Sequence, residues 1–153
     1  ISGTVLSVNI APRVGVRKDP LERGRLIAQF GLEGDAHAGD WHRQVSLLAE
    51  ESIEKIRQKG LSVVAGDFAE NITTSGLDLP ALPVGTKLQV GNEAILEVTQ
   101  IGKVCHTRCH IFYAVGDCVM PREGIFARVL VGGEVEVGDP LRILTAERTT
   151  PPF

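Results

Sequence analysis

The chain of 153 residues has little of what marks several large classes of protein. No apolar run approaches the ~18 residues that a membrane-spanning helix needs, so we expect no membrane partner. The net charge is −3 and aromatic residues make up only 5%, whereas nucleic-acid-binding domains usually carry a basic surface with aromatics. No signal-peptide pattern is visible either. We therefore expect a cytoplasmic protein that does not bind nucleic acid.

Cysteine is also scarce, and its number is odd. The three cysteines are Cys105, Cys109 and Cys118. A disulfide framework belongs to small secreted domains that lack a core, and a chain of this length can bury one. We therefore expect reduced thiols, whose function is decided by what surrounds them.

Glycine and proline, by contrast, occur throughout the chain, with 17 glycines and 8 prolines. They separate many short segments, which is typical of a β-rich domain with frequent turns. One helix is predicted over Ala49–Lys59, with acidic residues in its first turn and basic residues in its last. The pattern predicts a mainly β protein, a closed or nearly closed barrel with one peripheral helix, as a single domain over residues 1–145 with a loose tail at 146–153. The predicted strands are 3–10, 25–30, 45–48, a hairpin over 86–100, a second hairpin over 124–137, and 141–144.

Three polar stretches interrupt the strand pattern. The basic residues of 12–23 predict a solvated loop, or a cover for an anionic ligand. Residues 31–48 crowd glycine, aspartate, histidine and the one tryptophan together, and such loops on a rigid scaffold often carry function. There, His37 and His42 either ligate a metal or hydrogen-bond the loop to itself. The third stretch, 66–74, offers hydrogen-bonding side chains for a polar ligand or a tight turn.

The cysteines lie in Gly102–Leu130 (GKVCHTRCHIFYAVGDCVMPREGIFARVL), a segment that is also rich in histidine and basic residues. Basic neighbours favour the thiolate, which is the nucleophilic and metal-binding form of cysteine. Three interpretations stay open: a structural zinc site, a reactive thiolate, and cysteines that are merely buried small side chains. Zinc would need a second pair of ligands, from His37 and His42 or from Cys118 and a histidine.

Five motifs in a fixed order resemble the MOSC domain, named for the C-terminal part of molybdenum cofactor sulfurases, in its small stand-alone bacterial form. They are GDAHAG…HRQVSLL (34–48), ENITT-x-GLDL (70–79), GKVCHTRC (102–109), GDCVMPREGIFARVL-x-GG (116–133) and VGDP (137–140). Ala69 stands where the family commonly has glycine. The resemblance covers about 30–144 and implies a β-barrel that binds the molybdenum cofactor, a phosphate-bearing pterin with a dithiolene-bound metal.

The resemblance further implies one key cysteine, a sulfur carrier or molybdenum ligand, which here is Cys109 after Arg108, with Cys105 as second choice. Around it we expect Arg43, Lys103 and Arg108 to hold the pterin phosphate, Asn71 and Thr73 to hydrogen-bond the pterin, and His37 and His106 to relay protons.

We expect no pyridoxal-phosphate domain in these 153 residues, and so we expect sulfur transfer to need an external cysteine desulfurase as donor, with a molybdoenzyme as acceptor. Two alternatives remain: a molybdenum-dependent oxidoreductase module that reduces N-hydroxylated substrates, and a non-catalytic carrier stabilised by zinc.

Overall fold

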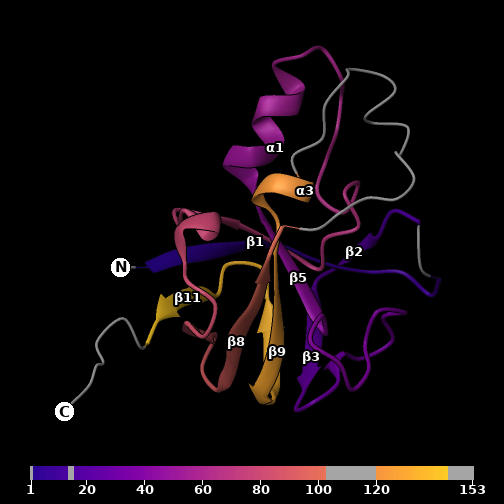
Figure 1. The fold of residues 1–153 in the computed structure, drawn as a ribbon. Helices are drawn as coiled ribbons and strands as arrows, with labels where there is room; N and C mark the ends of the chain where they lie inside the picture. The colour runs from indigo at the N-terminus through magenta and orange to yellow at the C-terminus, as the bar shows by residue number, and fades with distance from the viewer. Residues whose placement is uncertain (1, 14–15, 103–119, 145–153) are drawn as a thin grey trace.

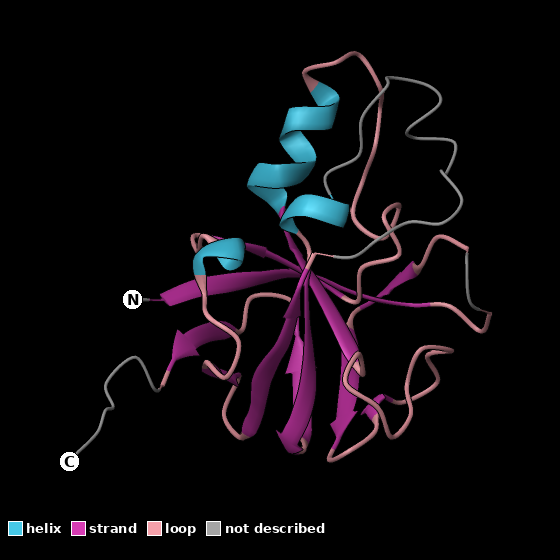
Figure 2. Ribbon diagram, in the orientation of Figure 1, coloured by secondary structure: helices cyan, strands magenta, loops and turns pink. Residues whose placement is uncertain are grey.

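The computed structural model describes residues 2–13, 16–102 and 120–144, and within them short strands dominate (Figure 2). The helical elements are α1 (Glu50–Arg57), the short α3 (Met120–Glu123) and a 3-10 turn, η1 (Leu79–Ala81). The strands are β1 (Ser2–Ile10), β2 (Asp19–Leu21), β3 (Arg23–Ile27), β4 (Gly31–Leu32), β5 (Val45–Ala49), β6 (Ile72–Ser75), β7 (Lys87–Val90), β8 (Ala94–Ile101), β9 (Ile125–Val131), β10 (Gly133–Glu136) and β11 (Pro140–Ile143).

Seven of these strands form a closed barrel (Figure 1). Its order is β11-β7-β8-β9-β5-β6-β1, and antiparallel pairing between β11 and β1 closes the ring. Strand β2 extends the sheet beyond β1, while β10, β3 and β4 form a second, smaller sheet. Neighbouring barrel strands are antiparallel except β5 and β6, which run parallel. The predicted mainly β, closed barrel is therefore confirmed.

The barrel interior is filled by side chains that alternate along each strand, as the two-residue period of a strand requires. On β9, Ile125, Ala127 and Val129 belong to this core and are fully buried. Phe126 lies between them in sequence and so faces the opposite way. It joins a second apolar cluster outside the barrel.

Helix α1 covers that second cluster. Ile53 and Ile56 are fully buried there, because residues three apart share one face of a helix. Glu50 and Glu51 occupy the first turn, and Lys55 and Arg57 the last, which suits the helix dipole. The predicted peripheral helix is confirmed, although it ends at Arg57 rather than Lys59. Figure 1 shows α1 beside α3 at one end of the barrel, where Lys55 Nζ lies 2.8 Å from Glu123 Oε2.

The first predicted hairpin is confirmed and the second is wrong. β7 and β8 pair as expected, but β10 pairs with β3 instead of turning back on β9. The reason lies in Gly132 and Gly133, which we expected to form a hairpin turn. A Cβ on Gly132 would lie 2.8 Å from the carbonyl oxygen of Leu26. The glycines allow a close approach to β3, which leads the chain into the smaller sheet.

Two stretches that we expected to be loops contain strands. The basic stretch 12–23 contains β2, and its Lys18 is only 2% exposed rather than solvated. The polar stretch 66–74 runs into β6, where Thr73 is fully buried. The predicted tail at 146–153 lies outside the described residues. No helix in the described part of the chain is long and apolar enough to cross a membrane.

Candidate functional site

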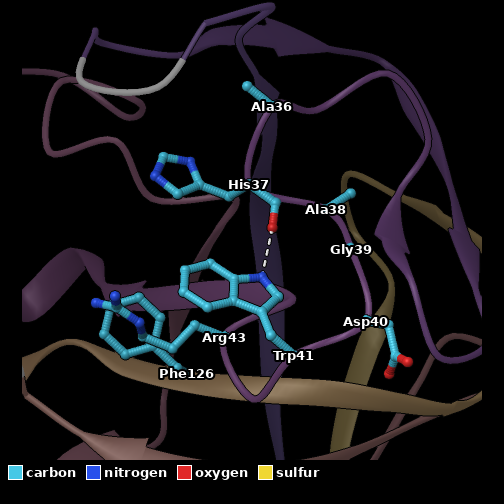
Figure 3. A pocket seen from close by; sticks show the side chains of 8 residues that line it. All are labelled: Ala36, His37, Ala38, Gly39, Asp40, Trp41, Arg43 and Phe126. Carbon is cyan, nitrogen blue, oxygen red and sulfur yellow. Dashed lines mark hydrogen bonds between the residues drawn. The ribbon is translucent and has the colours of Figure 1, made fainter.

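The loop between β4 and β5 forms a pocket against β9. The pocket has a volume of ≈ 360 Å³, which lies within the roughly 300–1,000 Å³ typical of small-molecule sites. Figure 3 shows Trp41 and Arg43 of the loop beside the ring of Phe126, with Asp40 directed away from them. The lining residues are Ala36, His37, Ala38, Gly39, Asp40, Trp41, Arg43 and Phe126.

Both ends of this loop are fixed by close contacts. At its start, Gly31 has a φ of 127°, and a Cβ there would lie 2.5 Å from the carbonyl oxygen of Gln44. At its end, the Gln44 Oε1 atom accepts a hydrogen bond of 2.9 Å from the backbone N–H of Val129 on β9. Between them, the indole N–H of Trp41 donates to the carbonyl of His37 over 2.8 Å. The loop therefore presents its side chains from a braced backbone.

Arg43 is the cation of the pocket, and two aromatic rings flank it. Its Cζ lies 4.7 Å from the centre of the Trp41 ring and 5.4 Å from that of Phe126. Both distances are within the ~6 Å range of a cation–π interaction. The Nε atom of Arg43 is buried and has no hydrogen-bond partner among the described residues. A buried donor without a partner costs free energy. The pocket therefore contains a positive, planar guanidinium whose Nε–H donor is unsatisfied in the described structure.

The pocket lies on the outer wall of the barrel, because Phe126 faces away from the barrel interior. A barrel often gathers its ligand site at one mouth. Here the long β4–β5 loop folds back over the outside of β9 instead.

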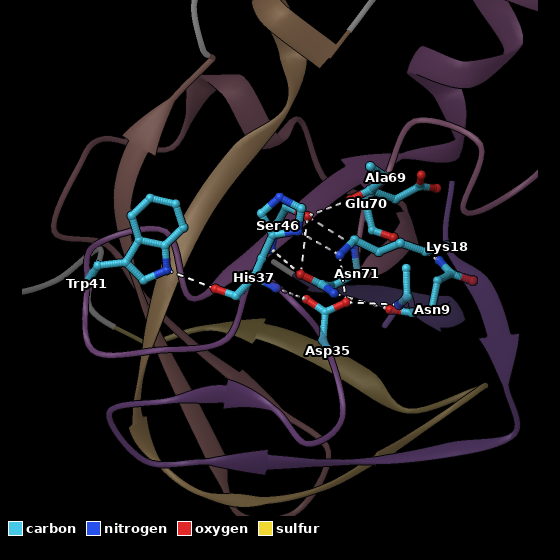
Figure 4. A network of polar contacts seen from close by, with 10 residues as sticks. Asn9, Lys18, Asp35, His37, Trp41, Ser46, Ala69, Glu70 and Asn71 are labelled. Atoms are coloured by element: carbon cyan, nitrogen blue, oxygen red, sulfur yellow. Dashed lines mark hydrogen bonds and ion pairs between the residues drawn. The ribbon is translucent and has the colours of Figure 1, made fainter. Parts of the chain in front are cut away.

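Behind the pocket, Lys18 and Asp35 form a buried ion pair with a distance of 2.6 Å between Nζ and Oδ1 (Figure 4). Burial by itself raises the pKa of Asp35, but the hydrogen bond and charge of Lys18 outweigh it, with help from the N–H of Ala11. The net pKa of Asp35 is lowered, so its carboxyl group is ionised at neutral pH. The Nζ atom of Lys18 also lies 3.0 Å from Nδ1 of His37, which lines the pocket.

A second buried network surrounds Asn71 and Glu70. The Asn71 side chain accepts from the N–H of Ser46 over 2.9 Å and donates to the carbonyl of Asn9 over 3.1 Å. The Glu70 carboxylate accepts from Thr73 Oγ1 over 2.6 Å and from the N–H of Gly66 over 2.9 Å. Burial is the largest influence on Glu70 and raises its pKa. Asn71 and Thr73 therefore brace the strands here, and their expected contact with a pterin stays a prediction.

The two histidines of the loop are engaged separately. His37 contacts Lys18, whereas Nε2 of His42 lies 2.9 Å from Oε1 of Gln100 on β8. Across residues 2–13, 16–102 and 120–144, no group of three or more His, Cys, Asp or Glu side chains is placed to hold a metal ion. The predicted zinc site would use cysteines that lie outside those ranges, namely Cys105, Cys109 and Cys118. That prediction stays untested.

The structure brings together two of the residues predicted from sequence, His37 and Arg43, in one pocket. The predicted site residues Lys103, Cys105, His106, Arg108 and Cys109 lie outside the described residues, so their roles stay predictions.

Four residues in or behind the pocket were not predicted as site residues: Lys18, Asp35, Trp41 and Phe126. Trp41 had a usable signal, since it is the one tryptophan of the chain and lies inside the glycine-rich loop. Asp35 lies in the same loop and in the motif at 34–48, but nothing in the sequence showed its partner. Lys18 and Phe126 carried no signal, because their roles depend on contacts between distant segments.

Among the comparisons with known proteins, a family model shows the family and solved structures show the fold. The family model described as MOSC domain matches residues 34–142, well over half of the chain. Among solved structures, the YUAD protein from Bacillus subtilis superposes with a TM-score of 0.77 at 18% identity, over 92% of this chain and 94% of that one. YiiM from Geobacillus stearothermophilus gives 0.69 at 21% identity, over 93% and 75% of the two chains. YiiM from Escherichia coli gives 0.69 at 20%, over 97% and 72%. A search of the curated proteins finds no match.

Proposed function

We propose that this chain, which belongs to the MOSC domain family, binds the molybdenum cofactor in the pocket of the β4–β5 loop and handles its sulfur through Cys109. The observation that carries the proposal is Arg43. Its guanidinium lies between two aromatic rings in a pocket of ≈ 360 Å³, and its buried Nε has no partner among the described residues.

The described residues suit a phosphate-bearing pterin. A guanidinium presents several N–H donors in one plane and can bind phosphate through two of them at once. The flat, half-exposed ring of Trp41 offers a surface for a heteroaromatic ring system. When bound, the cofactor supplies a molybdenum centre with a terminal sulfur. The chain supplies the positive charge, the aromatic wall and the thiol.

The sulfur step belongs to Cys109. Basic residues next to it in sequence, Arg108 among them, favour the thiolate. The thiolate attacks the outer sulfur of a persulfide on a donor protein, of the class made by a pyridoxal-phosphate-dependent cysteine desulfurase. A new S–S bond forms on Cys109 while the donor's S–S bond breaks, and the donor leaves as a thiolate. A molybdoenzyme is the proposed final acceptor. Delivery requires an external thiol that attacks the inner sulfur of the Cys109 persulfide, so that the outer sulfur leaves as sulfide and Cys109 forms a mixed disulfide with that thiol.

The test measures molybdenum and pterin per protein after the chain is co-expressed with cofactor biosynthesis and passed through gel filtration. In Arg43→Met we expect at least a tenfold lower content, since hydrogen bonds to a charged group contribute about 1.5–3 kcal/mol. Arg23→Met is the matched control, because Arg23 is 60% exposed and pairs only with surface glutamates of β10 in the described structure. Equal retention in both variants would exclude Arg43 as the phosphate ligand. A wild-type protein that holds no cofactor would exclude the function.

The sulfur step is measured separately, as persulfide formed on incubation with a desulfurase and free cysteine. Cys109→Ala should lose the persulfide, whereas Cys118→Ser should keep it. If Cys109→Ala still carries the persulfide, Cys109 is the wrong residue, and Cys105→Ala is the next variant to test.

A further inference from the structure

Strand β8 carries a β-bulge where it runs past the pocket beside β9 (Figure 1). Val98 lies opposite Ala127, and the next pair along the two strands is Gln100 with Phe126. Thr99 is therefore an extra residue on β8, without a register partner on β9. A bulge of this kind re-aims the side chains around it, and bulges are frequent beside functional sites.

The bulge brings Gln100 to the outer wall of the barrel. Ala94, Leu96 and Val98 alternate into the barrel core, so without the extra residue Gln100 would be the next side chain to face inward. Instead Gln100 is paired with Phe126, whose ring lies in the pocket wall outside the barrel. Because directly opposite residues share one face of a sheet, the bulge places an amide side chain beside the pocket.

Thr99 and Gln100 both hold His42, the residue that follows Trp41 in the β4–β5 loop. The hydroxyl of Thr99 donates to the carbonyl of His42. The Oε1 atom of Gln100 lies 2.9 Å from Nε2 of the His42 ring and accepts from it, because an amide oxygen has no proton to donate. The bulge therefore binds both the backbone and the ring of this histidine.

The amide nitrogen of Gln100 is fixed to the backbone. It donates to the carbonyl of Gly102 over 2.8 Å. Gly102 is itself held, since its N–H donates to the carbonyl of Gly124 over 2.6 Å. A flipped amide would direct its oxygen at the Gly102 carbonyl and its nitrogen at His42. The bond to Gly102 therefore keeps the oxygen turned toward the loop.

We propose that Gln100 is a positioning residue that, through the ring of His42, fixes Trp41 in the wall of the pocket. The rings of His42 and Trp41 meet edge to face, with their centres 5.7 Å apart and their planes at 71°. This spacing lies within the range in which aromatic rings attract one another. Trp41 in turn lies against the guanidinium of Arg43, at 4.7 Å from its ring centre to Cζ.

The consequence concerns how tightly the pocket binds a planar ligand. An indole ring that is already held in place loses little conformational freedom when a ligand stacks on it, so less of the binding free energy is lost to ordering. Gln100 thus contributes to affinity without touching the ligand. This inference rests on the proposed function only for the identity of the ligand.

The experiment uses the fluorescence of Trp41, which reports on the loop alone because it is the one tryptophan of the chain. Acrylamide quenching is measured without cofactor on the folded wild type and on Gln100→Leu, which keeps a side chain of similar size but loses both hydrogen bonds. We expect the quenching constant to rise by about 1.5- to 2.5-fold, because Trp41 is 38% exposed while the loop is held and gains exposure when the loop is released.

Gln89→Leu is the matched control. The amide nitrogen of Gln89 also donates to a backbone carbonyl, that of Asn92 over 3.0 Å, but in the β7–β8 turn. Its quenching constant should equal that of the wild type. A Gln100→Leu protein that is quenched no more than Gln89→Leu would overturn the proposal.

A second pair of variants tests whether Gln100 acts through His42. His42→Phe keeps a ring beside Trp41 but removes the hydrogen bond to Gln100, so it should raise the quenching constant on its own. In the His42→Phe background, Gln100→Leu should then add nothing, because residues that act through one contact are not additive. Additive increases would show that Gln100 reaches Trp41 by another route and would refute the role assigned to His42.

The contribution to ligand binding is measured as molybdenum and pterin retained per protein. Gln100→Leu should retain less than Gln89→Leu. Full retention together with raised quenching would contradict the contribution of Gln100 to affinity. Because the quenching is recorded without cofactor, the position of Trp41 is tested even if the wild type binds none, and failure of the proposed function is distinguished from failure of this inference.

Discussion

Replacement of Asn71 by alanine distinguishes a strand brace from a cofactor ligand. Asn71 is 1% exposed and its side chain joins two separate segments. Its Oδ1 accepts from the N–H of Ser46 on β5, and its Nδ2 donates to the carbonyl of Asn9 on β1. Asn71→Ala leaves both backbone groups without this side-chain partner in a place that water does not reach.

The magnitude follows from those two groups. A buried polar group that loses its partner costs about 1–3 kcal/mol. The hydroxyl of Ser46 also donates to Asn71 Oδ1 over 3.3 Å, but it keeps its hydrogen bond of 3.3 Å to the carbonyl of Ala69 and is not counted. The two backbone groups together give a loss of about 3 kcal/mol in the free energy of unfolding. The same substitution at Asn92, which is exposed in the β7–β8 turn, should stay within about 0.5 kcal/mol of wild type.

The assay is urea denaturation of both variants and the wild type without cofactor, followed by fluorescence of Trp41. A midpoint shift with an unchanged slope reports the change in stability. If Asn71→Ala unfolds within 0.5 kcal/mol of wild type but retains less pterin, Asn71 is a ligand and the bracing argument fails.

Two further predictions concern the same buried contacts. Gly66→Ala should lower the free energy of unfolding by at least about 2 kcal/mol, because its Cβ would lie 2.1 Å from the Lys18 carbonyl oxygen. Gly60→Ala is the control, since Gly60 has a similar φ (97° against 91° for Gly66) but no atom within 4 Å of the added Cβ. A comparable loss of stability in Gly60→Ala would show that φ alone is responsible. Burial raises the pKa of Glu70 above its ordinary value of 4.5, so the folded state binds the proton more tightly, and the stability this gives is lost as pH rises through the folded pKa. The stability of wild type relative to Glu70→Gln, measured by urea denaturation from pH 4.5 to pH 8, should therefore fall with pH; a difference that does not change would contradict the burial argument.

The parts of the fold that were predicted correctly depend on local patterns. The β7–β8 hairpin shows two-residue alternation on both sides of Gly91, and both its turn and its register are set within a few residues. Helix α1 is equally local, with its charges at the ends and its isoleucines three apart. The hairpin predicted over 124–137 failed because a glycine pair has two uses. It can turn a chain, or it can let another strand approach, as Gly132 does with Leu26.

The site was harder to predict for the same reason. Lys18 is one basic residue in a charged stretch, and such stretches are usually solvated. Its burial depends on Asp35, which is far enough along the chain that no periodic pattern links the two. Trp41 and Arg43 are close in sequence, but the second ring that flanks the guanidinium, Phe126, comes from β9. Sequence motifs therefore singled out the loop that lines the pocket, but not Phe126 or Lys18, which come from other segments.

Helix α1 has no side chain in the pocket, but it shares an apolar cluster with one residue of the pocket. Phe126 belongs to the same cluster as Ile53 and Ile56 of the helix and Leu48 of β5. The side of β9 that carries Phe126 therefore lies in an apolar layer on the outside of the barrel, whereas its neighbours Ile125 and Ala127 face the core. The peripheral helix thus completes the apolar layer on the outer wall where the pocket lies, while the barrel core, built from other side chains, keeps the strands of that wall in register.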